Sequence, residues 1–72
     1  MTTVKAGEEL LAALAEVRAL FPEWRLGQAV ANLALSAGLD GPGGVWEAED
    51  GQLLEAAHRL VARARARRAD AE

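Results

Sequence analysis

The side chains with the most chemical potential in this chain of 72 residues lie in the stretch FPEWRLGQAVANLALSAG, residues 21–38. At the periodicity of an α-helix, Arg25, Gln28 and Asn32 fall within about 60° of one another, and Ser36 extends the row. An Arg can meet a carboxylate through two parallel hydrogen bonds, and Gln and Asn can each donate and accept. We therefore expect this polar row to hold a carboxylate and backbone groups, either of this chain or of a ligand or partner.

Two interpretations of the polar row remain open. In the structural one, Arg25 pairs with Glu49 or Asp50. Gln28 and Asn32 then bond the backbone of the Gly-rich loop, whose polar groups need partners. In the functional one, part of the row faces outward and binds a partner or ligand. The structural interpretation predicts that the change R25A strands a carboxylate and lowers stability.

The inventory of reactive side chains is too short to favour catalysis. The chain has no Cys, no Tyr and one His. A nucleophile needs a base within hydrogen-bond reach, and nothing in the spacing of Ser36 and His58 suggests that they converge. A single His without Cys does not build a zinc site, and the GPGG segment lacks the strand and the Lys of a phosphate-binding loop. We expect no enzymatic activity, no catalytic residue, no metal and no cofactor.

A row of Arg residues marks the C-terminal end. Arg59, Arg63 and Arg67 recur every four residues and line one helical face, and Arg65 and Arg68 widen the patch. Such a row could bind nucleic-acid phosphates. No aromatic residue lies within it to stack bases, and cations near a helix C-terminus are favourable in any case. Nucleic-acid binding is therefore possible but less favoured.

Charge is distributed unevenly along the chain. The formal net charge of −3 combines −6 over residues 1–58, from three bases and nine acids, with +3 over residues 59–72, from five Arg and two acids. An acidic body with a basic end could associate head to tail with another copy.

Three helices position these groups. The first is predicted over about residues 6–21, with Thr3 as its N-cap and Gly7 as the competing position. Its apolar residues recur at the spacing of one helical face. They are Leu10, Leu14, Val17 and Phe21.

Pro22 breaks the pattern and suits the first turn of a second helix, from residue 22 or 23 to residue 37, antiparallel to the first. Gly38 then offers the left-handed C-cap position. Gly27, inside this helix, is expected either to allow close approach of another element or to be a tolerated surface glycine. The main buried face comprises Leu26, Val30, Leu33 and Ala37, and a second apolar face comprises Trp24, Ala31 and Leu35.

The segment GLDGPGG, residues 38–44, is a loop by composition. Val45 and Trp46 follow it, and as apolar residues in a polar connection they are expected to fold back onto the core. Asp50, or alternatively Glu47, is the predicted N-cap of a third helix over about residues 51–67. The sequence RRADAE after it is expected to fray. The buried face of this helix comprises Leu53, Ala57, Leu60 and Ala64.

The predicted fold is all-α, a small three-helix bundle with a Gly/Pro-rich loop between helices 2 and 3. Residues 1–72 make a single helical domain with a core of about 6–67 and frayed ends. A chain of this size buries only about 60% of the surface that its unfolded form exposes, so self-association, for example as a homodimer, is an open expectation.

Nothing in the sequence predicts a membrane span or a signal peptide, since there is no apolar run of spanning length and no basic start before an apolar block. Absence of Cys is compatible with a reducing cytoplasm. We therefore expect a cytoplasmic protein.

The runs FPEWRLGQAVANLA and VWEAEDGQLLEAAHRL resemble a group of small uncharacterised bacterial helical proteins. Their shared pattern is an aromatic residue, Pro, an acid and then Trp-Arg-x-Gly-Gln-x-x-x-Asn, followed after a short loop by an aromatic residue, an acidic pair and a Leu-rich helix. The resemblance covers roughly residues 10–60. This chain departs from the pattern in its longer, Gly-rich loop before Trp46. The resemblance implies a recurring helical domain and supplies neither an activity nor functional residues.

The function that these observations favour is a small cytoplasmic protein–protein interaction module or a subunit of an assembly. The alternative is a nucleic-acid-binding accessory protein that uses the C-terminal Arg row. The candidate interaction residues are Trp24, Leu35, Trp46, Arg59, Arg63 and Arg67, and the candidate structural polar row is Arg25, Gln28, Asn32, Glu49 and Asp50.

Overall fold

The computed structural model describes the backbone of residues 2–71 and the side chains of residues 5–70. This part of the chain forms four helices and no strand: α1 (Thr2–Leu20), α2 (Leu26–Ser36), α3 (Gly44–Glu47) and α4 (Asp50–Ala71). The all-α class is thus confirmed. The count differs from the predicted three, because the connection before α4 contains a single helical turn of its own.

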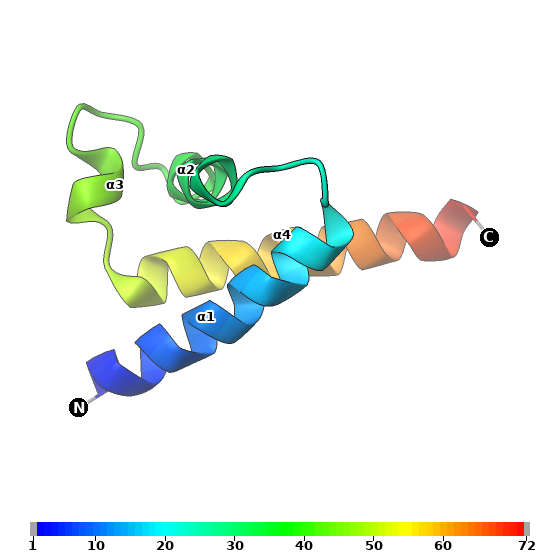
Figure 1. Ribbon diagram of the computed structural model, residues 1–72, viewed down its shortest axis with the longest axis horizontal. Helices are drawn as coiled ribbons and strands as arrows, with labels where there is room; N and C mark the ends of the chain where they lie inside the picture. The colour runs from blue at the N-terminus through cyan, green and yellow to red at the C-terminus, as the bar shows by residue number, and fades with distance from the viewer. Residues whose placement is uncertain (1, 72) are drawn as a thin grey trace.

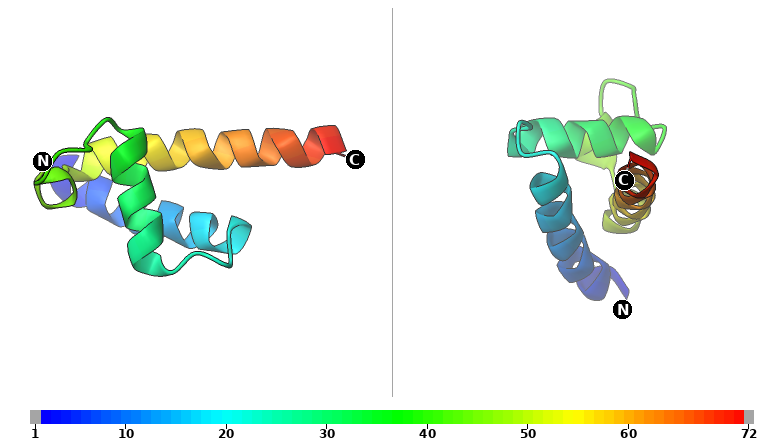
Figure 2. Two further views of the ribbon diagram at one scale, coloured as in Figure 1. Left: turned by 90° about the horizontal axis from the view of Figure 1, so that it is seen from above. Right: turned by 90° about the vertical axis from the view of Figure 1, so that its right-hand side faces the viewer.

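The two long helices α1 and α4 lie side by side and run in the same direction (Figures 1 and 2). In Figure 1, α2 is viewed along its axis while α1 and α4 run across the picture, so α2 crosses both of them steeply. The prediction that the first two helices are antiparallel is therefore wrong. The physical reason is the corner between them: residues 21–25 are not helical, and they redirect the chain.

Several helix limits differ from the predicted ones. α1 begins at Thr2, so Thr3 and Gly7, the predicted N-caps, both lie inside it. α2 begins at Leu26 because Pro22 and its neighbour form a turn in place of a first helical turn. The last helix, α4, extends to Ala71, where fraying was expected. Glu72, the final residue of the predicted frayed end, lies outside the described residues.

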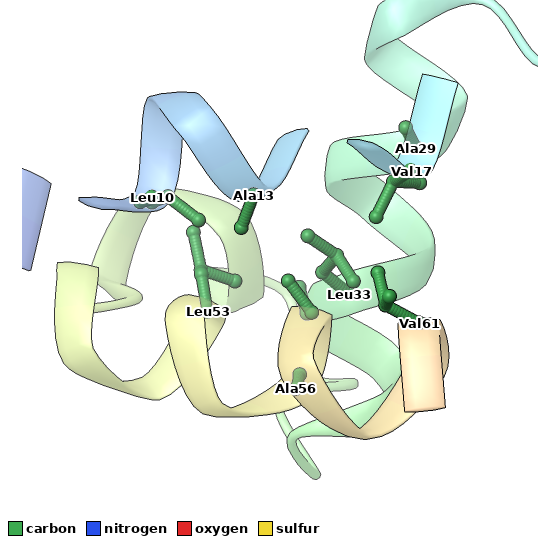
Figure 3. Packing of buried hydrophobic residues seen from close by; sticks show 10 residues of the cluster. Leu10, Ala13, Val17, Ala29, Leu33, Leu53, Ala56 and Val61 are labelled. Atoms are coloured by element: carbon green, nitrogen blue, oxygen red, sulfur yellow. The ribbon is translucent and has the colours of Figure 1, made fainter. Parts of the chain in front are cut away.

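The core lies where the three long helices meet. Leu33 of α2 is 1% exposed and reaches between Val17 of α1, which is fully buried, and Val61 of α4 (Figure 3). At the other end of the core, Leu10 of α1 lies next to Leu53 of α4. Small residues fill the positions between them and let the backbones approach closely. They are Ala13, Ala29, Ala34, Ala56, Ala57 and Ala64.

The buried face of α2 is only partly the predicted one. Leu33 is buried as expected, and Val30 and Ala37 are half-buried. Leu26, expected on the same face, is 50% exposed. It is the first residue of α2, and the fully buried Ala29 comes one turn later. A helix that crosses its neighbours steeply buries its middle and not its ends, which explains the difference.

The C-terminus of α2 is closed by Gly38, as predicted. Gly38 has a φ of +85°, the left-handed conformation that glycine adopts without a steric cost. The N–H of Leu39 donates to the carbonyl of Ala34 at 2.9 Å, and the N–H of Gly38 donates to the carbonyl of Leu35 at 3.0 Å. These two bonds are those of a Schellman motif, which satisfies carbonyls at the helix end.

Gly27 leads to a prediction with a matched control. A methyl group added at Gly27 would meet no atom within 4 Å, so of its two expected roles the surface glycine is the correct one. We expect G27A to stabilise the protein by about 0.5–1 kcal/mol, because alanine loses less backbone entropy in a helix. The control G38A removes the glycine at φ +85° and should destabilise it. Urea denaturation followed by circular dichroism measures both, and a destabilised G27A would contradict the account.

Candidate protein-interaction surface

Three large apolar side chains are exposed around one shallow hollow. Trp46 is 93% exposed, Leu35 57% and Val45 50%. The hollow has a volume of about 340 Å³, and Ala31 and Leu39 also line it. Single exposed apolar residues are common, but a contiguous group of them on a small protein is typical of a binding site. We call the group of Ala31, Leu35, Leu39, Val45 and Trp46 the Trp46 surface.

Two elements position the Trp46 surface. The C-terminal half of α2 contributes Leu35, and its Schellman turn sends Leu39 inward, where it packs against the core. The chain then returns through a tight loop. The N–H of Gly44 donates to the carbonyl of Gly41 at 2.9 Å, and a methyl group added at Gly44 would lie 2.2 Å from the carbonyl oxygen of Leu39. Only glycine permits this approach, which fixes α3 and Trp46 beside α2.

The expectation that Val45 and Trp46 fold back onto the core is wrong. No residue of α3 is buried, and the residues of the connection between α2 and α4 that pack against the core are Leu39, before α3, and Ala48, just after it. The close contact between Gly44 and Leu39 holds the start of α3 against the end of α2. The α3 side chains therefore stand on the outside of the molecule. The sequence shows two adjacent apolar residues, Val45 and Trp46, in a polar segment. This pattern does not specify whether their side chains face the core or the solvent.

Trp24 does not belong to the Trp46 surface. It precedes α2, and its ring stacks on that of Phe21 with centroids 4.4 Å apart and planes at 11°. Both rings pack against the core. Offset stacking of this kind stabilises a corner. Of the three apolar interaction candidates, the structure brings Leu35 and Trp46 together and assigns Trp24 to the turn between α1 and α2.

The polar row does not form the predicted ion pair. Among the described residues, the two ion pairs are Arg59–Glu55 at 3.6 Å and a contact between Arg65 and Glu16. Arg25 thus pairs with neither of the acids expected to meet it. The acids stand at the start of α4, whereas Arg25 stands at the start of α2 and is exposed. Asn32 is half-buried, with no hydrogen bond from its side chain among those of the described part of the chain.

Two Gln side chains, Gln28 of the polar row and Gln52 outside it, accept hydrogen bonds at two helix N-termini. Gln28 accepts a hydrogen bond from the backbone N–H of Arg25 at 2.8 Å, and Gln52 accepts one from the N–H of Glu49 at 2.9 Å. Arg has no acceptor in its side chain, so the Gln28 bond is half of a capping box. Asp50 is the first residue of α4, so Glu49, between the two predicted N-caps, occupies that position. Gln52 was missed, although the matching segments RLGQ and EDGQ are a readable signal.

The variants Q28A and R25A distinguish the capping role of Gln28 from the ion-pair role expected for Arg25. We expect Q28A to lower the free energy of unfolding by about 1 kcal/mol, because a backbone N–H loses its partner. We expect R25A to change it by less than about 0.5 kcal/mol, since the capped group is backbone and the side chain is exposed. This reverses the expectation drawn from the sequence. Urea titrations of both variants measure the difference, and a larger loss in R25A than in Q28A would refute it.

The Arg row is divided by the structure. Arg59 pairs with Glu55, one turn earlier on α4, and makes a long hydrogen bond of 3.4 Å to the carbonyl of Ser36. Both side chains of the pair are largely exposed, so it adds little stability. Arg63 and Arg67 line a second hollow, of about 520 Å³, and no ion pair among the described residues involves them. Of the three Arg residues in the row, Arg63 and Arg67 therefore present guanidinium groups on one face without an ion pair to any described residue.

Beyond Ala64, which is 7% exposed, every described side chain of α4 is exposed. α4 runs past the end of α1 and projects from the body of the molecule (Figure 2). We call residues 59–70 the basic end of α4. The body holds this segment through the buried Val61 and Ala64, through the hydrogen bond from Arg59 to the carbonyl of Ser36, and through the contact of Arg65 with Glu16 of α1.

The structure also places the other candidate groups, Ser36 and His58, within the described residues. Ser36 lies on α2 and His58 on α4, both exposed, and no hydrogen bond joins their side chains within residues 5–70. Within the described part of the chain, no group of three or more potential metal ligands comes together. In that same part, no helix has the length and apolar character to cross a membrane.

The Trp46 surface lies in the acidic part of the sequence. Residues 26–58 hold five acids and no Lys or Arg. Asp40 lines the hollow, and the carboxyl group of Glu47 lies against Gly43, where an added methyl group would be 2.9 Å from its carboxyl carbon. The hollow is therefore mostly apolar, with Asp40 on its rim and Glu47 just outside its lining. Comparison with protein-family models, with curated proteins and with solved structures finds no match to this chain, so the resemblance to small bacterial proteins stays a prediction.

Proposed function

We propose that this protein is a cytoplasmic protein–protein interaction module, without catalytic activity, that binds its partner through the Trp46 surface. The observation that carries the proposal is the 93% exposure of Trp46 beside Leu35 and Val45, around one hollow. A Trp in such a position is costly to leave in water and has no packing role in the isolated chain. Trp is also among the residues enriched where interface truncations cost the most.

Burial of Trp46 would contribute the largest single share of the free energy of a contact at this surface. A Trp buries roughly 150–250 Å² when it enters an interface, and each Å² of apolar surface removed from water contributes about 25 cal/mol. Leu35 and Val45 add to this area from either side of the hollow. A partner with an apolar side chain or a cationic group for the indole face would complement the surface, while the acidic rim would repel acidic partners.

The test is an affinity capture from the host's lysate with tagged wild type, W46A and the control L11A. Leu11 is 70% exposed on α1 and lies outside the hollow, so L11A removes exposed apolar surface elsewhere. We expect a defined protein to be retained by wild type and L11A, at low and high salt and after nuclease. W46A should lose it, by at least about 30-fold in affinity for a truncation of about 2 kcal/mol or more. Equal retention by W46A would overturn the proposal.

Nucleic-acid binding through the basic end of α4 is the second candidate, favoured by the exposed guanidinium groups of Arg63 and Arg67 on a projecting helix. If it is the function, retained material disappears with nuclease, and affinity falls steeply with salt because Arg–phosphate contacts release counterions. The double variant R63A/R67A would then lose binding while W46A keeps it. The two candidates thus predict opposite results for the same pair of variants.

A further inference from the structure

The two oppositely charged ends of the molecule lie at the two ends of its longest dimension. The molecule measures 39 × 28 × 19 Å. In Figure 1, α3 lies at one end of the long axis and the C-terminus of α4 at the other. The first end carries the Trp46 surface with its acidic rim, and the second carries the Arg residues. A single chain cannot bring these two ends together, because the rigid helix α4 connects them.

The acidic end has the chemistry to receive a basic helix. Trp46 offers an indole face, over which a guanidinium group is attracted by the ring's negative charge density. Asp40 lines the hollow and Glu47 directly follows Trp46; both residues are exposed, and no ion pair among the described residues involves either of them. This end therefore carries unneutralised negative charge around an apolar centre.

The basic end of α4 has the matching features. Arg63 and Arg67 are four residues apart, so they project from one face of the helix. Leu60, Ala66 and Asp70 lie beside them around the same hollow. The aliphatic parts of Arg side chains can cover apolar surface while the guanidinium groups reach the carboxylates.

We propose that the Trp46 surface of one molecule receives the basic end of α4 of a second copy of this chain. Arg63 and Arg67 of one copy would meet Trp46 and the acidic rim of the other. This inference rests on the proposed function, since it uses the same surface, and it names the partner. Charge complementarity between the two ends is the observation that selects a second copy over an unrelated apolar partner.

In a dimer with two-fold symmetry, the contact between the basic end and the Trp46 surface occurs twice. A two-fold axis perpendicular to the long dimension sets two copies antiparallel, so that each basic end reaches the other copy's Trp46 surface. Such a dimer is closed and contains the same contact twice, which avoids the open filaments of one-way head-to-tail contacts. The antiparallel homodimer is therefore the assembly that the charge distribution supports.

The experiment is a charge exchange followed by sedimentation velocity of the full chain. One variant, D40R/E47R, makes the rim basic, and the other, R63E/R67E, makes the end of α4 acidic. We expect wild type to sediment as a dimer and each variant alone as a monomer, because like charges then face each other. An equimolar mixture of the two variants should sediment as a dimer, since both contacts are again between opposite charges.

Far-ultraviolet circular dichroism checks that each variant folds. The variant R63Q/R67Q is a milder form of the charge change, because it removes the two positive charges without adding acids to the helix end. A monomeric wild type at every concentration, dimeric single variants, or a mixture that stays monomeric would each overturn the inference. Its failure is distinguishable from that of the proposed function. A monomeric chain that still captures another protein through Trp46 loses only the homodimer, whereas dimers unaffected by W46A would remove the Trp46 surface from the interface.

Discussion

Replacing Leu33 with alanine should remove roughly half of the stability of this protein. Leu33 is 1% exposed and is one of the two largest fully buried side chains, and it contacts the core at the point where three helices meet. Comparable truncations cost about 2–5 kcal/mol. A domain of this size has a stability on the order of 4–10 kcal/mol, so L33A should lose roughly half of it. Equilibrium urea denaturation measures the loss.

The matched control for this prediction is L11A, which deletes the same atoms from the 70% exposed Leu11 of α1. Its free energy of unfolding should stay within about 0.5 kcal/mol of wild type, as for most surface changes. If the two variants lost similar stability, the assignment of Leu33 to the centre of the core would be wrong.

The second large effect is expected for Gly44→Ala. The added methyl carbon would lie 2.2 Å from the carbonyl oxygen of Leu39 and 3.1 Å from its carbonyl carbon, both backbone atoms that cannot rotate away. The loop must open to relieve this clash, at a cost of about 1–3 kcal/mol, the usual range for a destabilising substitution. Because α3 begins at this residue, Trp46 should also move away from Leu35.

Gly41→Ala is the control, since a methyl group there meets no atom within 4 Å and the loop composition is otherwise unchanged. Urea denaturation should give a clear loss for G44A and little change for G41A. In two-dimensional NMR spectra, the shifts caused by G44A should concentrate in residues 35–47. A G44A protein with wild-type stability and spectrum would mean that Leu39 and α3 are not held together as described.

Gly38 and Gly44 also matter for the proposed function, because both position Trp46. Gly38 turns the chain at the end of α2, and Gly44 lets the returning segment pass close to Leu39. Together they hold Trp46 on the outside of the molecule, in a short loop of fixed conformation. A flexible segment with the same apolar residues would fold back onto the body. G44A should therefore weaken a contact made through Trp46 even under conditions in which the body remains folded, which separates presentation of the surface from stability of the core.

Much of the local structure could be read from the chain alone. The one-face spacing of Leu10, Val17 and Leu53 correctly marks side chains that are buried. Gly38 in the left-handed C-cap position also follows from local rules, because only the backbone conformation of a few neighbouring residues is involved. The capping bonds in RLGQ and EDGQ are local in the same way, since a Gln at the third helical position accepts a hydrogen bond from the backbone N–H of the residue just before its own helix.

The errors share a different cause. The expected partner of Arg25, and the side on which Val45 and Trp46 lie, depend on how distant segments meet. A row of polar residues in the sequence shows which hydrogen-bonding groups share a helical face. It does not show which other helix end lies close to them in the folded protein. The two acids expected at Arg25 lie at the start of α4, whereas Arg25 lies at the start of α2.

The sequence by itself therefore determined that the chain is helical, which faces of its first and last helices are apolar, and where α2 stops. These depend on spacing and on backbone preferences within one or two turns. Only the tertiary structure decided that α1 and α4 run in the same direction, with α2 crossing them. That arrangement leaves α3 outside the core and residues 65–70 of α4 beyond it, because the buried space is already filled by Leu33, Val17 and the alanines around them.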